Sequence, residues 1–196
     1  MFLKDQLHKR KLGKIIDVDF YCGSWLPDWR YPQPYETTVS ASKKLGGGVI
    51  LELSHEIDLA NFLFGPLEIY AAYSKNSNIL NIDVEDHTVI VAKNKENIVI
   101  TIRLNFCTSP RKRIIDIRGV EGEIKIDLEN NKLTIDTKNG GHITKLNDQS
   151  RDDLFKKQFL NFLNCISKTE FPMCSFSAGL EVLSLIKEIK KLSKNN

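Results

Sequence analysis

Alternating apolar and polar residues near the N-terminus predict the first strand. In the segment KIIDVDFYC, Ile16, Val18, Phe20 and Cys22 would point to one side, and the residues between them to the other. A period of two residues is typical of a strand with one buried face. We therefore expect these four side chains to lie in the core.

A series of similar segments follows Gly65-Pro66. Short turns separate them, and no helical pattern lies between them, which favours antiparallel pairing. The Lys95-Glu96 connection is short enough for a hairpin. The segments expected to be strands are residues 67–74, 87–94, 97–106, 111–119, 123–128 and 132–137.

Residues 49–64 have a helical period instead. At 100° per residue, one face of this helix is apolar and should meet the sheet. A short helix is expected over residues 2–11, ending before Gly13. The residues predicted to form the apolar face of the 49–64 helix are Ile50, Leu53, Ile57, Ala60 and Phe64.

Two more helices are predicted at the C-terminus. Ser150 followed by Asp152 and Asp153 is a good N-terminal signal for the first of them. The second ends in a lysine-rich turn that suits the helix dipole. Apolar stripes are expected at Leu154, Phe155, Phe159, Phe162, Leu163 and Ile166 in the first helix, and at Leu180, Leu183, Ile186 and Ile189 in the second.

This order of elements predicts the α+β class. A chain of 196 residues with 41% hydrophobic residues suits one domain, residues 1–196, with a proper core. We expect a large, mostly antiparallel open β-sheet with helices packed on one face. The segment GSWLPDWRYPQPYETT, with three prolines, should be a long ordered loop, and such loops are usually functional.

Charge and cysteine content narrow the function classes. The net charge is +3, and no run of Lys and Arg exceeds three residues. This argues against nucleic-acid and membrane partners. The four cysteines lack CxxC spacing, so we interpret them as free thiols in a reducing cytoplasm. Without a signal peptide or membrane span, a cytoplasmic location is expected.

The polar residues within the apolar 49–64 segment are the candidate site residues. Glu52 and His55 are one turn apart, project in similar directions, and should face a covered cavity. The alternative is a structural pair, with Asp58 capping a nearby loop. A zinc site of the HExxH type would need a second histidine at position 59, which is Leu59, so no metal is expected.

Four stretches carry a family resemblance. GKIIDVDFYCGSWLPDWR, SASKKLGGGVILELSHEIDLANFLFG, EDHTVIVA and IRGVEGEIKIDL together resemble the C-terminal domain of the Gfo/Idh/MocA family of NAD(P)-dependent oxidoreductases. The resemblance implies a fold like the C-terminal domains of the dihydrodipicolinate and glyceraldehyde-3-phosphate dehydrogenase type. It also implies an N-terminal Rossmann domain that binds the cofactor.

Site roles follow from the same resemblance. His55 would be the catalytic residue that transfers a proton to or from a sugar hydroxyl, and Glu52 would orient the substrate. The family pattern is more often Asp-x-x-x-His than Glu-x-x-His, which leaves the division of roles between these two open. The resemblance implies substrate contacts from Lys44, Trp25, Trp29, Arg30 and Asp58.

Two motifs of the family are absent from the sequence. There is no GxGxxG after a strand and no Glu-Lys-Pro. We therefore expect no cofactor bound by this chain alone, and NAD(P) only with a Rossmann-domain partner. Residues 1–12 would be the remnant of the last helix of that missing domain.

Two functions remain open. The first is the substrate-binding domain of a sugar or nucleotide-sugar oxidoreductase, inactive alone. The second is a non-catalytic oligomerisation or sugar-binding module. The expected partners are a small sugar, a second copy in a homodimer or homotetramer formed through the open sheet face, and possibly a separate Rossmann-domain polypeptide.

Overall fold

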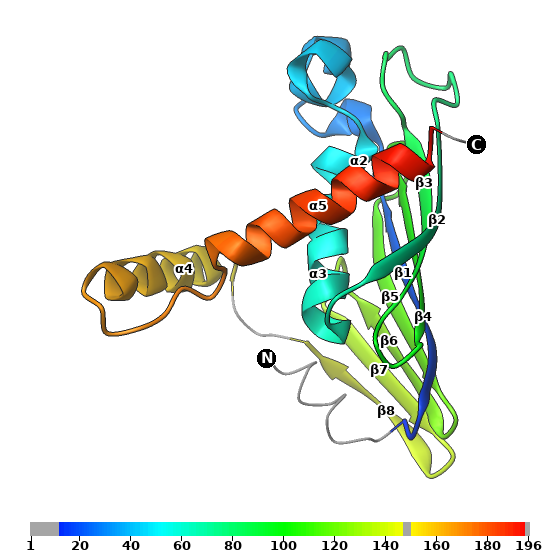
Figure 1. The fold of residues 1–196 in the computed structure, drawn as a ribbon, viewed down its shortest axis with the longest axis vertical. Coiled ribbons are helices and arrows are strands. Elements are labelled where there is room, and N and C mark those ends of the chain that lie inside the picture. The colour runs from blue at the N-terminus through cyan, green and yellow to red at the C-terminus, as the bar shows by residue number, and fades with distance from the viewer. Residues whose placement is uncertain (1–11, 147–149, 195–196) are drawn as a thin grey trace.

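An eight-stranded sheet forms the centre of the protein (Figure 1). The structure, a computed structural model, describes residues 12–146 and 150–194. The expected helix over residues 2–11 lies outside the described residues. The strands are β1 (Ile15–Gly23), β2 (Glu68–Lys75), β3 (His87–Lys93), β4 (Val99–Asn105), β5 (Lys112–Gly119), β6 (Gly122–Asp127), β7 (Lys132–Thr137) and β8 (Gly140–Lys145).

The strand order places the first strand in the middle of the sheet. The order is β2-β3-β4-β1-β5-β6-β7-β8. β1 pairs with β4 in parallel and with β5 in antiparallel orientation, and the other neighbouring pairs are antiparallel. The predicted mostly antiparallel sheet is therefore confirmed. A central strand is covered along both edges, so its side chains lie where the core is deepest.

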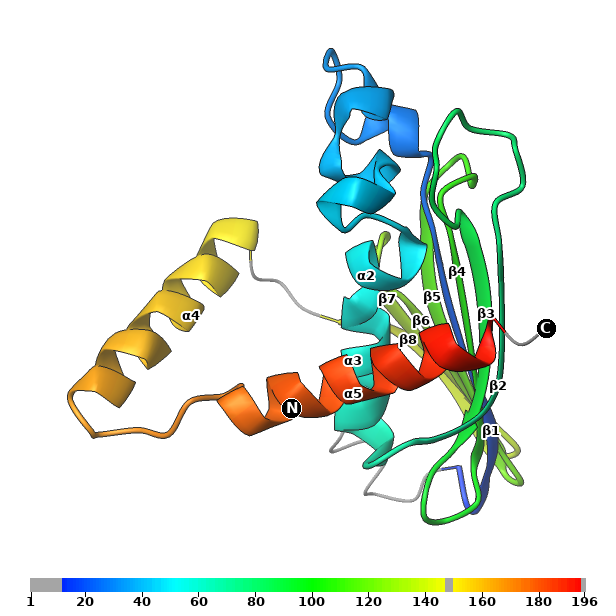
Figure 2. The same ribbon diagram turned by 45° about the horizontal axis from the view of Figure 1, so that its top comes forward.

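Three helices cover one face of this sheet (Figures 1 and 2). They are α2 (Val49–Glu52), α3 (Ser54–Phe64) and α5 (Phe176–Leu192). The predicted inward residues of the 49–64 segment are confirmed, because Ile50, Leu53, Ile57 and Ala60 are buried and Phe64 packs against the core. In α5 the buried residues are Val182, Leu185, Ile186 and Ile189, so the prediction is confirmed for Ile186 and Ile189 but wrong for the exposed Leu180 and Leu183.

Helix α4 (Arg151–Ile166) stands away from the sheet (Figure 2). Ser150 and Asp153 form the predicted N-terminal signal as a capping box. The apolar stripe is exposed, however, with Phe159 61% and Phe162 60% accessible. The expectation that α4 would pack on the sheet is wrong for this chain, because a helical period shows that one face is apolar but not what covers it.

Two strand details differ from the prediction. Ile16 is 53% exposed rather than buried, because the β1–β5 register shifts between Ile15 and Asp17 and turns this residue outward. β8 was not predicted. It is an edge strand without buried residues, so it lacks the alternation that identifies half-buried strands.

The aromatic-rich segment after β1 is irregular, as predicted. Together with the residues that follow it up to Leu45, it contains four single-turn 3₁₀ helices among the described residues. They are η1 (Leu26–Asp28), η2 (Tyr35–Thr37), η3 (Val39–Ala41) and η4 (Lys43–Leu45). None of the helices that the structure describes has the length and apolar character needed to span a lipid bilayer.

Candidate active site

The helix after the three glycines is interrupted between the two predicted catalytic residues. Leu53 has φ −106° and ψ 24°, so α2 ends at Glu52 and α3 begins at Ser54. Glu52 therefore ends α2 and His55 lies in the first turn of α3, and no contact between their two side chains is described. Among the described contacts, the ionic partner of His55 is Glu56.

Glu56 is the buried carboxylate of the site. Its residue exposure is 0%, although His55 just before it and Asp58 two residues after it are exposed. It follows Leu53 by three positions and precedes Ala60 by four, so it lies on the apolar face of the helix. A carboxylate in this position is costly unless a partner compensates its charge.

Arg113 provides that compensation from the sheet. The β1–β5 register places Arg113 directly opposite Cys22. Residues opposite each other in neighbouring strands have side chains on the same face, so both project toward α3. Arg113 Nε donates a hydrogen bond of 2.5 Å to Glu56 Oε1, which completes a buried ion pair between α3 and β5.

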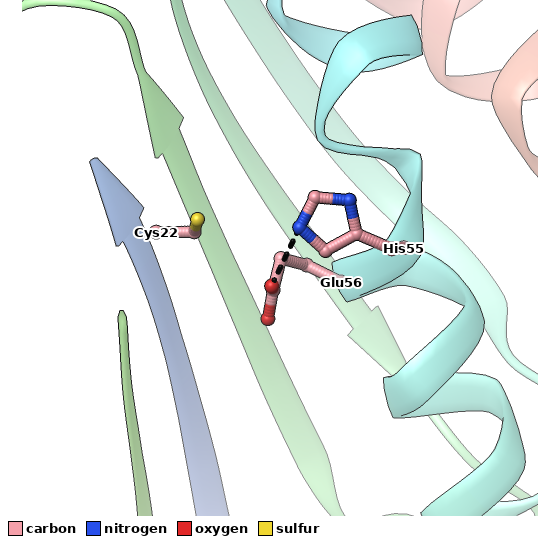
Figure 3. A group of neighbouring side chains, drawn as sticks. All are labelled: Cys22, His55 and Glu56. Carbon is pink, nitrogen blue, oxygen red and sulfur yellow. Dashed lines mark ion pairs between the residues drawn. The ribbon is translucent and has the colours of Figure 1, made fainter. Parts of the chain in front are cut away.

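His55 lies beside this pair at the surface. Its Nε2 is 3.1 Å from Glu56 Oε1, and its side chain is 45% exposed (Figure 3). The expectation that His55 faces a covered cavity is wrong for the described residues, since they leave nearly half of the His55 side chain accessible. A histidine that is both exposed and held by a carboxylate can exchange a proton with a bound molecule.

The Cys22 thiol completes the group. Its burial, followed by the negative charge of Glu56, raises the pKa of Cys22 from its ordinary 9.0 to about 12. The thiol therefore stays protonated at neutral pH. Glu56 Oε2 is buried and has no hydrogen-bond partner among the described residues.

This raised pKa predicts a pH-dependent stability. Between pH 9 and 12 the folded state keeps a proton on Cys22 that the unfolded chain releases, so the free energy of unfolding falls as pH rises. From pH 8 to pH 10 we expect wild type to lose about 1 kcal/mol more than Cys22→Ala. Urea unfolding at both pH values measures this, and equal losses would contradict it.

The same three side chains offer donor atoms that could hold a metal ion. Donors of Cys22, His55 and Glu56 lie within 4.8 Å of one another. The Arg113 guanidinium already binds Glu56 Oε1. A metal ion would also have to displace the Cys22 proton. The arrangement therefore fits an ion-paired proton-exchange site better than a metal centre.

A second group of this kind lies where β2 and β4 end and β3 begins. Asp86 Oδ1 is 2.8 Å from His87 Nδ1, and Ser77 donates to both Asp86 oxygens. Burial opposes ionisation of Asp86, but the hydrogen bonds from Ser77 and His87 outweigh it and lower the pKa of this carboxyl group. Cys107 Sγ lies 3.7 Å from Asp86 Oδ2. With its carboxylate fully bonded, this group is structural.

The other predicted site residues lie on separate elements. Glu52 is half-buried at the end of α2, and no contact partner of its carboxylate is described. Trp25 and Trp29 pack against the core, and Trp29 Nε1 donates to Ser24 Oγ. The exposed residues of the predicted set are Arg30, which donates to Ser40 Oγ at 3.5 Å, Lys44 in η4, and Asp58 on α3.

Sequence reasoning missed Glu56 and Arg113. A signal for each was present. Glu56 is the charged position within the Leu53-to-Ala60 apolar face, and Arg113 shares the strand face of Ile115 and Ile117. When two elements each carry a charged residue of opposite sign on an otherwise apolar face, the two residues are expected to form an ion pair.

Comparisons with known proteins place this geometry in context. No curated protein matches the chain. Among solved structures, it is similar to an oxidoreductase from Agrobacterium radiobacter in complex with NAD+, L-tartaric acid and magnesium, with 21% identity and a TM-score of 0.80 over 99% of this chain and 59% of that one.

Two further similar structures bind nucleotide-linked compounds. The WlbA dehydrogenase from Bordetella pertussis, in complex with NADH and UDP-GlcNAcA, has 20% identity and a TM-score of 0.74 over 98% of this chain and 58% of that one. The 3-ketoreductase KijD10 from Actinomadura kijaniata, in complex with NADP and TDP-benzene, has 16% identity and a TM-score of 0.81 over 97% and 57%.

At identities this low the structural likeness shows the fold alone, and the chain spans less than two thirds of each similar structure. The family assignment comes from a sequence model. The Gfo/Idh/MocA model, which describes the C-terminal alpha/beta domain of this oxidoreductase family, matches residues 4–196. Since this match covers nearly the whole sequence, the chain belongs to the Gfo/Idh/MocA oxidoreductase family, as its C-terminal domain.

Proposed function

We propose that this chain is the substrate-binding domain of an NAD(P)-dependent sugar or nucleotide-sugar oxidoreductase. The observation that supports the proposal is the exposed His55 imidazole, held 3.1 Å from a buried carboxylate that Arg113 compensates. An imidazole accepts and donates protons near neutral pH, which suits exchange with a sugar hydroxyl. The two similar structures with UDP-GlcNAcA and TDP-benzene support a nucleotide-linked substrate.

The other roles are secondary. Glu52 would contact or orient the sugar from the end of α2. We assign additional contacts to the aromatic-rich segment and the residues around it, where planar and charged side chains can bind a sugar and its phosphates. These residues are Trp25, Trp29, Arg30, Lys44 and Asp58.

The glycine segment does not fit a dinucleotide. A Cβ atom on Gly47 would lie 2.2 Å from the carbonyl oxygen of Val39, so this glycine serves close backbone packing. A Cβ atom on Gly48 would lie 2.4 Å from the Glu85 carboxylate, which would repel a phosphate. We therefore assign NAD(P) to a Rossmann-domain partner, and to this chain only the substrate and the proton; alone, it would be inactive.

The proposal is tested by calorimetric titration of the purified chain. We expect UDP-GlcNAcA or a TDP-sugar to bind, and His55→Asn to weaken binding by roughly tenfold through loss of one hydrogen bond to a charged or polar group. His142→Asn, on the exposed strand β8, is the matched control. NADH should not bind. Micromolar NADH affinity, or no response to any nucleotide sugar, would count against the proposal.

The outer face of the sheet favours a second candidate function. Tyr70, Tyr73, Val89 and Val99 are exposed on β2, β3 and β4, whereas the helices lie on the other face. A non-catalytic oligomerisation module would use this face in a homodimer or homotetramer. Light scattering during the same titration distinguishes the two, because an oligomer that binds no sugar supports the second candidate alone.

A further inference from the structure

We infer that Glu56, anchored by Arg113, is a positioning residue that fixes His55 with its proton on Nε2 and leaves Nδ1 as the nitrogen that meets the substrate. The substrate part of this inference rests on the proposed function. The tautomer is a property of the protein without ligand.

The first step is the arrangement around one oxygen. Glu56 Oε1 lies 2.5 Å from Arg113 Nε and 3.1 Å from His55 Nε2. The carboxylate oxygen can only accept, and the guanidinium can only donate. A bare lone pair on Nε2 would lie on an atom 3.1 Å from this anion. The proton on neutral His55 is therefore favoured on Nε2 rather than on Nδ1.

The second step is the rigidity of the carboxylate. The Glu56 side chain is 1% exposed, so it cannot turn toward solvent as a surface glutamate would. The guanidinium that holds it projects from the central part of the sheet, where β5 pairs with β1. Within the described part of the chain Glu56 Oε2 has no hydrogen-bond partner, so Arg113 is the described group that competes with His55 for the negative charge.

The third step is the direction of the free nitrogen. In Figure 3 the Nε2 edge of the ring faces Glu56, and the second ring nitrogen lies on the side turned away from Glu56 and Cys22. When a sugar hydroxyl gives up its proton, the O–H bond breaks with its electrons left on oxygen. An N–H bond forms at Nδ1, and the resulting imidazolium is stabilised by Glu56.

Other charged groups near His55 do not reverse this preference. Cys22, which faces it from β1, keeps its proton and is neutral. Arg113, from β5, is bound to Glu56. On its own helices, Glu52 and Asp58 are three residues before and after it, and no contact of either with the ring is described.

A second histidine of the protein, for which the opposite tautomer is predicted, provides an internal control. His87 is 2.8 Å from Asp86 Oδ1 through Nδ1, not Nε2. By the same electrostatic argument, His87 should carry its proton on Nδ1. One protein therefore holds two carboxylate–histidine pairs with opposite predicted tautomers, which a single spectrum can compare.

The test is a long-range ¹H–¹⁵N correlation spectrum of the chain labelled at its histidine ring nitrogens. The pH is raised until these signals stop moving, so that every ring is neutral, and His55→Gln and His87→Gln assign the signals. We expect His55 as the Nε2–H form and His87 as the Nδ1–H form. Glu56→Gln should lower the Nε2–H to Nδ1–H ratio of His55 by about tenfold, the scale of a lost charge-assisted contact. It should leave His87 unchanged.

The remaining experiments distinguish a positioning role of Glu56 from a role in folding. Asp86→Asn should change His87 and leave His55 unchanged. An Nδ1–H form of His55 in wild type would overturn the inference even if Glu56→Gln does not fold, and so would a folded Glu56→Gln with an unaltered ratio. Added UDP-GlcNAcA should move the Nδ1 signal more than the Nε2 signal, and the reverse would overturn the substrate part. If no nucleotide sugar binds, the proposed function fails, but the tautomer result still stands by itself.

Discussion

Arg113→Met is expected to destabilise the domain by about 3 kcal/mol, because it leaves the Glu56 carboxylate buried without its cation. Methionine keeps most of the length of the arginine side chain, so the loss measures charge compensation rather than volume. We place the value at the lower end of the range for buried pairs because the Arg113 side chain is 26% exposed. Urea unfolding followed by circular dichroism measures it.

Two further variants test the explanation of this result. Arg111→Met removes a surface pair, since Arg111 is 55% exposed and lies 2.9 Å from Glu129, and we expect a loss below about 1 kcal/mol. The double variant Glu56→Leu/Arg113→Met removes both charges and should recover most of the lost stability. If the double variant is less stable than Arg113→Met alone, the buried-charge explanation is wrong.

Phe20→Ala should cost about 3–5 kcal/mol, the usual range for removing a buried aromatic ring from a core. Phe20 is fully buried in the central strand β1, and its ring meets that of Phe64 edge-on with centroids 6.2 Å apart. This contact holds the end of α3 against the sheet. We therefore expect the variant also to loosen the helix that carries His55, visible as faster amide hydrogen exchange in α3.

Phe159→Ala is the matched control on another helix. Phe159 belongs to an apolar stripe in the sequence just as Phe20 belongs to an alternating strand, but it is 61% exposed on α4. We expect a change within about 0.5 kcal/mol in the isolated chain. A loss comparable to that of Phe20→Ala would mean that α4 packs on the domain in solution.

The periodic patterns predicted most of the helices and strands, but not which elements pack against one another. Period-two segments gave seven of the strands, and the capping signals gave the start of α4, because both depend on residues close together in the chain. β8 escaped because an exposed edge strand needs no apolar alternation. The stripe of α4 was visible, yet no local pattern states which surface covers it.

The features of the candidate site also divide into those that the local sequence predicted and those that it did not. The sequence by itself determined the α+β class, the glycine-preceded helix with its inward face, and the unusual histidine on that helix, since these follow from local periodicity and residue type. Only the tertiary structure decided that β1 enters the middle of the sheet, and that its register brings Cys22 opposite Arg113. That placement brings Arg113 to Glu56 and makes Glu56 the compensated carboxylate of the site, because an ion pair between α3 and β5 depends on distances between elements far apart in the chain.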